Sequence, residues 1–115
     1  MSQFKHLFNP ITVRGVTIRN RIVMAPMNTN FAEPDGSVGE RFTKYYVERG
    51  KGGTGLLIVS SAYIDAAAKK RVGSLLLDDD RFIPTSKAFA TAVHATGARV
   101  LQQLNHNGRL LTSSK

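Results

Sequence analysis

The sequence predicts an α/β fold in which short parallel strands alternate with helices. Three apolar runs bounded by turn formers, at residues 21–26, 55–60 and 99–104, are typical of buried strands. Two segments between these runs repeat apolar residues at helical spacing. Strands that alternate with helices favour parallel pairing through right-handed crossovers. One structural unit is expected over residues 1–115, because no repeat, linker or low-complexity tract divides the chain.

An N-terminal β-hairpin is expected before the first parallel strand. Two β-branched runs, residues 11–13 and 16–18, flank Arg14 and Gly15. Short β-branched runs on either side of a glycine-containing turn are typical of a hairpin. The first parallel strand, residues 21–26, follows directly and ends at a proline.

Each predicted helix carries its own start or stop signals. The first is predicted from residues at i, i+3, i+4 and i+7, namely Phe42, Tyr45, Tyr46 and Arg49. Glycines at positions 50, 52 and 53 are expected to stop it. The second begins at Pro84, which suits a first helical residue, and ends at Gly97. One face of that helix is formed by Phe89, Ala92, Val93 and Thr96. The aspartates at 78–80 lie just before it, where the helix dipole favours negative charge.

Residues 50–55 match the glycine pattern G-x-G-x-x-G without the context of a dinucleotide site. In that fingerprint the glycines follow a strand and open a helix, so that the pyrophosphate meets the helix N-terminus. Here they follow a predicted helix and precede a strand. We therefore interpret them as a helix C-cap followed by a tight turn.

Composition excludes several classes of protein. The chain has no cysteine, which excludes disulfides, thiolate catalysis, and iron–sulfur or zinc sites that use cysteine ligands. No pair of its histidines has metal-ligand spacing, so no metal site is predicted. No signal peptide and no apolar run of the ~20 residues needed to span a bilayer is present. We expect a cytoplasmic protein without a membrane partner.

The net charge of +8, from 16 basic and 8 acidic residues, raises the alternative of a nucleic-acid-binding module. The basic residues are scattered, however, and the one cluster is at residues 69–71. Aromatic residues do not interleave with them as a base-stacking surface requires. We interpret the cluster as a solvated loop and expect no nucleic-acid partner. The positive charge also suits an anionic, phosphate-bearing cofactor.

Polar side chains follow all three predicted parallel strands. The strand ends are formed by residues 25–29, 60–63 and 103–109, with amides, hydroxyls, one imidazole and one guanidinium. Taken alone, the polar residues of each segment would be interpreted as ordinary turn residues. Because the carboxyl ends of parallel strands form the ligand site in α/β folds, we expect the three segments to line one polar pocket.

Three parallel strands and two helices do not complete a sheet of this kind. An all-parallel sheet is covered on both faces, whereas two helices on one side leave the other face bare. Val100 and Leu101 would also lie on an unpaired edge strand. We therefore expect the first part of a longer (β/α)₈ barrel, which takes ~250 residues. The alternative is a catalytically inactive, truncated product that associates with itself, and a homo-oligomer is left open.

Four runs, in this order along the chain, resemble the N-terminal third of the old yellow enzyme family. They are LFNP at residues 7–10, NRIVMAPM at 20–27, GGTGLLI at 52–58 with YY at 45–46 and RG at 49–50 before it, and QLNHNGR at 103–109. The motif APMNT at residues 25–29 is most similar to the form found in the branch with 2,4-dienoyl-CoA reductases and bile-acid enoate reductases. The resemblance implies a TIM barrel whose N-terminal hairpin closes the bottom. It also implies FMN-dependent transfer of hydride from NAD(P)H to the activated C=C bond of an enone or enoyl thioester.

The resemblance also implies the residues of the cofactor site. The backbone of Ala25, Pro26 and Met27 is expected close to the isoalloxazine ring. Asn28 is expected beside the flavin O4/N5 edge, where an amide can donate to negative charge on the reduced ring. Ser61, from the second strand, is expected to be a small residue that faces the flavin. Gln103, from the third strand, is expected to hydrogen-bond the pyrimidine edge through its carboxamide. The run after the third strand supplies loop-shaping or substrate-side residues, His106 and Arg109.

No catalytic residue is predicted within the 115 residues. In the family, the His/His or His/Asn pair that binds the substrate oxygen, the catalytic tyrosine, and the arginine and glycine-rich loops that hold the FMN phosphate come later in the chain. The isolated 115 residues are therefore expected to be inactive and to bind FMN weakly or not at all. An iron–sulfur cluster and FAD are expected only in a longer chain. The substrate itself, and the choice between NADH and NADPH, are left open.

Overall fold

The long strand β4 (Leu56–Tyr63) is the centre of a four-stranded parallel sheet in the computed structural model, which describes residues 3–69 and 71–110. Strand β6 (Arg99–Asn105) pairs along one edge of β4. Strands β3 (Val23–Met24) and β5 (Leu75–Leu76) pair with opposite ends of the other edge. The predicted parallel sheet is confirmed, although β3 is shorter than expected and β5 was not predicted. Lys70 of the basic cluster and residues 111–115 lie outside the described part.

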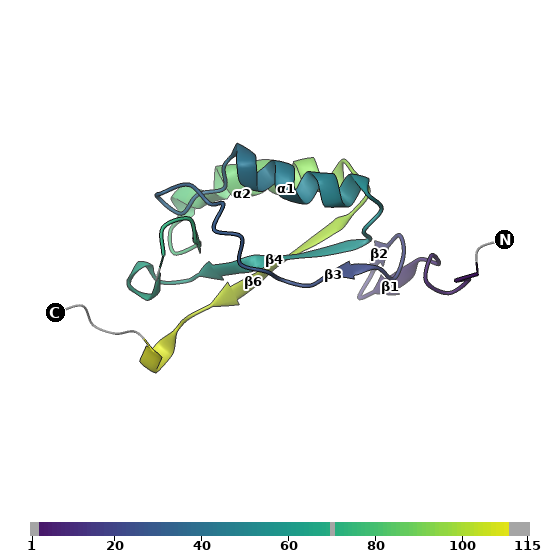
Figure 1. Ribbon diagram of the computed structural model, residues 1–115, viewed down its shortest axis with the longest axis horizontal. Coiled ribbons are helices and arrows are strands. Elements are labelled where there is room, and N and C mark those ends of the chain that lie inside the picture. Colours follow the sequence, from purple (N-terminus) through teal and green to yellow (C-terminus); the bar gives the residue numbers. More distant parts are fainter. Residues whose placement is uncertain (1–2, 70, 111–115) are drawn as a thin grey trace.

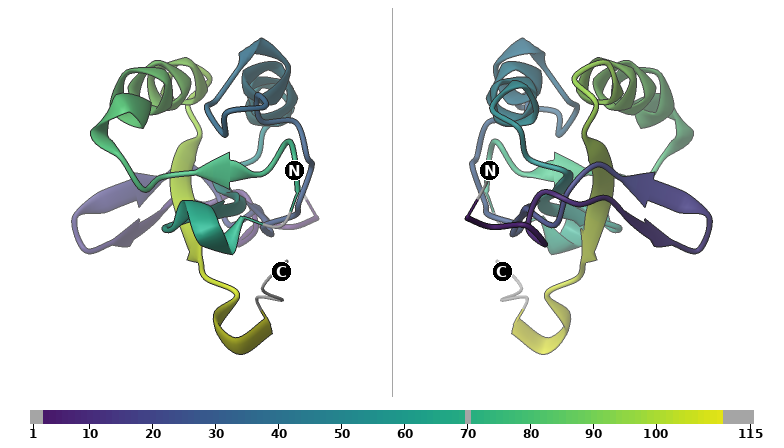
Figure 2. Two further views of the ribbon diagram at one scale, coloured as in Figure 1. Left: turned by 90° about the vertical axis from the view of Figure 1, so that its left-hand side faces the viewer. Right: turned by 90° about the vertical axis from the view of Figure 1, so that its right-hand side faces the viewer.

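Two helices cover one face of this sheet. Helices α1 (Glu40–Lys51) and α2 (Ile83–His94) lie side by side above β4 and β6 (Figures 1 and 2). The core between the layers contains aromatic residues from the helices, among them Phe42, Tyr46 and Phe89, and Leu57 and Val59 from β4. On the opposite face, Val23 and Leu101 are 50% and 56% exposed. Only one face of the sheet is therefore covered within the described residues, as the sequence predicted.

The N-terminal hairpin is confirmed. Strands β1 (Ile11–Val13) and β2 (Val16–Ile18) pair antiparallel, with Val13 opposite Val16. Arg14 and Gly15 form the two-residue turn, with φ angles of 45° and 80°. Positive φ at both central residues is the geometry that matches the twist of a tight hairpin. The hairpin lies at the amino-terminal end of the parallel strands (Figure 1).

The glycines at positions 50, 52 and 53 have different structural roles. Gly50, predicted to stop the helix, lies in its last turn, where a Cβ would stand 2.2 Å from Thr96 Oγ1. It is thus a site of close approach between α1 and the turn before β6. Gly52 caps the helix, and Gly53 turns the chain towards β4 with a φ of 105°. The interpretation of residues 50–55 as cap and turn holds, with Gly50 corrected to a helical residue.

Helix α2 begins and ends slightly earlier than predicted. Pro84 is its second residue, and a 3₁₀ turn, η2 (Asp80–Phe82), precedes it. Asp79 caps that turn, because its carboxylate accepts a hydrogen bond of 2.8 Å from the Arg81 N–H. Thr96, predicted on the helix face, lies beyond the last helical residue, and Gly97 turns the chain into β6 with a φ of 84°. No helix within residues 3–69 and 71–110 is long and apolar enough to cross a bilayer.

Arg19 joins three segments at the amino-terminal end of the sheet. Its guanidinium donates to the carbonyl oxygens of Thr96 at 2.9 Å, Thr54 at 3.0 Å, and Gly50. These carbonyls belong to the end of α1, the turn before β4 and the turn before β6. Charge-assisted hydrogen bonds to carbonyls near a helix C-terminus are favourable, because those carbonyls carry partial negative charge. Arg19 therefore fixes both helix-to-strand turns relative to the hairpin.

Candidate functional site

A bulge in β4 shapes the carboxyl end of the sheet. Val59 lies opposite Gln102 and Ala62 opposite Leu104, so that Ser60 and Ser61 together face the single residue Gln103. An extra residue of this kind shifts the side-chain alternation by one position. Leu57 and Val59 point to the helix layer, and after the bulge Ala62 does so as well. Ser61 consequently points to the face that no helix covers.

Two residues from outside β4 satisfy the backbone groups of the bulge. The Ser60 N–H donates to Tyr46 Oη at 2.9 Å, and Gln102 Nε2 donates to the Ser60 carbonyl at 2.7 Å. Tyr46 is fully buried, and burial raises the pKa of its hydroxyl, which is therefore a neutral phenol at ordinary pH. The helical spacing predicted that Tyr46 lies in the first helix, but the supporting roles of Tyr46 and Gln102 were not predicted. The sequence signal was the pair of serines interrupting an apolar strand.

The ends of β3 and β4 meet at a side-chain hydrogen bond. Ser61 Oγ donates to Asn28 Oδ1 at 2.9 Å. This bond occupies the carbonyl oxygen of the Asn28 amide and leaves its two N–H donors free for a ligand. Two of the residues that the family resemblance implied for the cofactor site are thus in direct contact, from segments 33 residues apart.

The third strand end lies beside this pair. Gln103 is opposite the Ser60–Ser61 bulge, and its exposed side chain makes no hydrogen bond to another described residue. Ahead of Asn28, Ala25 and Met27 are exposed and Pro26 is half-buried. The expected convergence of the three strand ends is therefore observed, on the face of the sheet without helices.

The chemistry of these residues fits a flavin ring. Gln103 presents an unpaired carboxamide, which both donates and accepts, and the pyrimidine edge of a flavin requires both. Asn28 presents free N–H donors, and Met27, 60% exposed, presents apolar surface for a ring.

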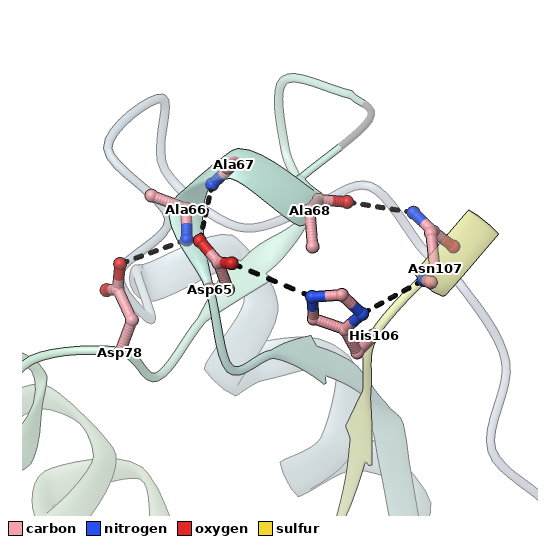
Figure 3. Close-up of polar contacts among 8 residues, drawn as sticks. Asp65, Ala66, Ala67, Ala68, Asp78, His106 and Asn107 are labelled. Carbon is pink, nitrogen blue, oxygen red and sulfur yellow. Dashed lines mark hydrogen bonds and ion pairs between the residues drawn. The ribbon is translucent and has the colours of Figure 1, made fainter. Parts of the chain in front are cut away.

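His106 and its neighbours join the loops after β4 and β6 (Figure 3). The Gly108 N–H donates to His106 Nδ1 at 2.9 Å, and His106 Nε2 lies 3.6 Å from Asp65 Oδ2. Asn107 Nδ2 donates to the Ala68 carbonyl at 2.8 Å. Both ring nitrogens of His106 are thus directed at the chain itself. Of the two roles implied for His106, this geometry favours loop shaping.

Two aspartates complete this junction: the sequence indicated no role for Asp65, and it predicted for Asp78 only a place before the second helix. Asp65 Oδ1 accepts from the Ala67 N–H at 2.8 Å and caps the 3₁₀ turn η1 (Ala66–Ala68). Asp78 Oδ2 accepts from the Ala66 N–H at 3.1 Å. Arg109 follows in the 3₁₀ turn η3 (Gly108–Leu110), where it is exposed. The role of Asp65 could not be read from its local sequence, because its partner His106 is 41 positions away.

Known proteins match this chain over nearly its whole length. Residues 6–115 match the NADH:flavin oxidoreductase / NADH oxidase family. An NADH oxidase of Thermoanaerobacter brockii is 43% identical over 113 residues, which are 97% of this chain and 17% of that protein. The chain thus spans about a sixth of that relative's length.

Solved structures agree with this match. A 2-naphthoyl-CoA reductase in complex with 2-naphthoyl-CoA superposes with a TM-score of 0.89 at 31% identity, over 96% of this chain and 17% of that one. The old yellow enzyme homologue from Zymomonas mobilis superposes with a TM-score of 0.82 at 29% identity, over 93% and 30% of the two chains. The hairpin, the three main parallel strands and the two helices are therefore part of a TIM-barrel fold. The chain belongs to the NADH:flavin oxidoreductase / NADH oxidase family.

Proposed function

We propose that the protein containing this chain is an FMN-dependent ene-reductase. Its net reaction adds a hydride from NADH or NADPH, and a proton, across the activated C=C bond of an α,β-unsaturated carbonyl compound. The observation that carries the proposal is the convergence of Asn28, Ser61 and Gln103 at the carboxyl ends of adjacent strands. Family membership supplies the flavin and nicotinamide chemistry. Bound FMN supplies the two-electron carrier between nicotinamide and substrate.

Each residue of the convergence has a separate task in this proposal. Gln103 holds the pyrimidine edge of the ring through its free carboxamide. Ser61 orients the Asn28 amide so that its N–H groups face the ring edge, where they stabilise negative charge. Ala25, Pro26 and Met27 form the apolar wall beside the ring. His106 fixes the loop after β6 against Asp65, and Arg109 is carried by that loop.

The function is tested on the purified protein that contains this chain. We expect FMN to be released on denaturation, in an amount equal to the protein. We also expect anaerobic oxidation of NADH or NADPH that requires trans-cinnamaldehyde and yields the saturated product. A protein without FMN, or an FMN protein that leaves the C=C bond intact under these conditions, would contradict the proposal. A cytoplasmic location stays a prediction.

Replacing Gln103 by leucine is expected to weaken FMN binding about tenfold. Leucine removes the carboxamide, and one or two hydrogen bonds of about 0.5–1.5 kcal/mol each are lost. The melting temperature of the apoprotein should be unchanged, since the Gln103 side chain has no partner among the described residues. FMN affinity is measured by flavin fluorescence, with Gln3→Leu as the control. An unchanged affinity would remove Gln103 from the cofactor site.

A further inference from the structure

A polar cavity adjoins the candidate flavin site. Its volume is about 340 Å³, and it is lined by Asn28, Asn30, Tyr63, Arg71 and Ser74. Asn28 belongs to both places, since it also accepts the hydrogen bond from Ser61. The other residues come from the segment after β3, the end of β4 and the loop before β5. The cavity therefore opens at the carboxyl ends of the strands, beside the proposed reaction centre.

The cavity carries one positive charge and no negative charge. Arg71 is the charged residue of its lining, and the other four side chains are neutral hydrogen-bonding groups. Arg71 is exposed, and its guanidinium makes no hydrogen bond or ion pair with residues 3–69 or 72–110. The aspartates of the neighbouring junction, Asp65 and Asp78, accept from the backbone of η1. A guanidinium with five free donors among neutral amides and hydroxyls suits an oxyanion.

The walls of the cavity are joined by contacts between two loops. The Ala32 N–H donates to the Gly73 carbonyl at 3.0 Å, and the Leu76 N–H donates to the Gly36 carbonyl at 3.0 Å. Gly73 has a φ of 83°, and a Cβ there would stand 2.4 Å from the Asn30 carbonyl oxygen. These contacts hold Asn30 and the loop that carries Arg71 and Ser74 in place before a ligand binds. A preformed wall reduces the ordering cost of binding.

We propose that this cavity binds the carboxylate of an unsaturated acid, with Arg71 as its anchor. The inference rests on the proposed ene-reductase function, and it names free acids as the substrate class. Arg71 contacts the carboxylate oxygens, and Asn30, Tyr63 and Ser74 offer further hydrogen bonds. The C=C bond of an acid held in this way extends towards Asn28, which the cavity shares with the candidate flavin site.

Binding of a non-reactive pair of ligands tests the inference on the FMN-loaded protein. The saturated acid 3-phenylpropanoate and its amide have the same shape but differ in charge. Calorimetry should show that the acid binds at least about tenfold more tightly than the amide, as expected for charge-assisted hydrogen bonds. Arg71→Gln should raise the Kd of the acid about tenfold or more and leave that of the amide within about twofold. Arg71→Lys should recover part of the loss, because it keeps the charge without the planar fork.

The matched control is Arg81→Gln, which removes the same charge from an arginine that stacks on Phe82 outside the cavity. It should leave both Kd values unchanged. Equal effects of Arg71→Gln on acid and amide would overturn the inference, as would displacement of the acid by inorganic phosphate at equal concentration. If the protein reduces cinnamaldehyde but binds 3-phenylpropanoate no more tightly than its amide, the inference is wrong and the proposed function still stands. Absence of any C=C reduction would overturn the proposed function instead.

Discussion

Replacing Arg19 by methionine is expected to lower the free energy of unfolding by about 2–4 kcal/mol. The guanidinium donates to three backbone carbonyls, at Gly50, Thr54 and Thr96. Hydrogen bonds to a charged group contribute about 1.5–3 kcal/mol each, and water replaces part of that contribution at partly exposed carbonyls. Methionine keeps the apolar stem of the side chain, so the loss is confined to the polar contacts. The measurement is the midpoint and slope of urea denaturation.

Arg21→Met is the matched control for Arg19→Met. Arg21 lies two positions further along the same segment, and its exposed side chain makes no hydrogen bond to another described residue. Its replacement should change the free energy of unfolding by less than about 0.5 kcal/mol. Equal effects of the two substitutions would show that loss of positive charge, rather than loss of the three carbonyl contacts, destabilises the protein.

The main elements could be predicted because each carries its signal locally. The apolar run of β4 and the 3.6-residue spacing of α1 are read from consecutive residues. Strand β5 carries no such signal, since two residues show no periodicity. It is held in place by hydrogen bonds from the Leu76 N–H to the Gly36 carbonyl and from the Leu77 N–H to the Tyr63 carbonyl. These partners lie in distant segments, and only the completed fold brings them together.

The same distinction applies to the candidate site. Its residues could be named because polar side chains follow each parallel strand, and such strand ends share one edge of a sheet. The groups that hold these residues in position could not be predicted from the sequence. Arg19 has partners 31, 35 and 77 positions away, and nothing in its local sequence separates it from Arg14 or Arg21. The bulge at Ser60 depends on the Tyr46 hydroxyl, and the helical spacing of Tyr46 predicts only that it lies in α1.

Removing that hydroxyl, in Tyr46→Phe, is expected to cost about 1–3 kcal/mol of stability. The ring contacts with Phe42 and Phe89 remain, at centroid distances of 4.9 and 5.6 Å. The Ser60 N–H, in a residue only 4% exposed, loses its acceptor. A buried donor left without a partner costs its full desolvation penalty, which is larger than the net contribution of an ordinary hydrogen bond.

Tyr46→Phe should also weaken FMN binding, because the bulge that Tyr46 supports turns Ser61 towards Asn28. Urea denaturation of the apoprotein and flavin fluorescence measure the two effects separately. Tyr45→Phe is the control: the Tyr45 ring stacks under Arg49, and its hydroxyl has no hydrogen-bond partner among the described residues. If both variants lose stability equally, the Ser60 contact is not the cause. If Tyr46→Phe loses stability but keeps its FMN affinity, the bulge holds the strand together without positioning the flavin site.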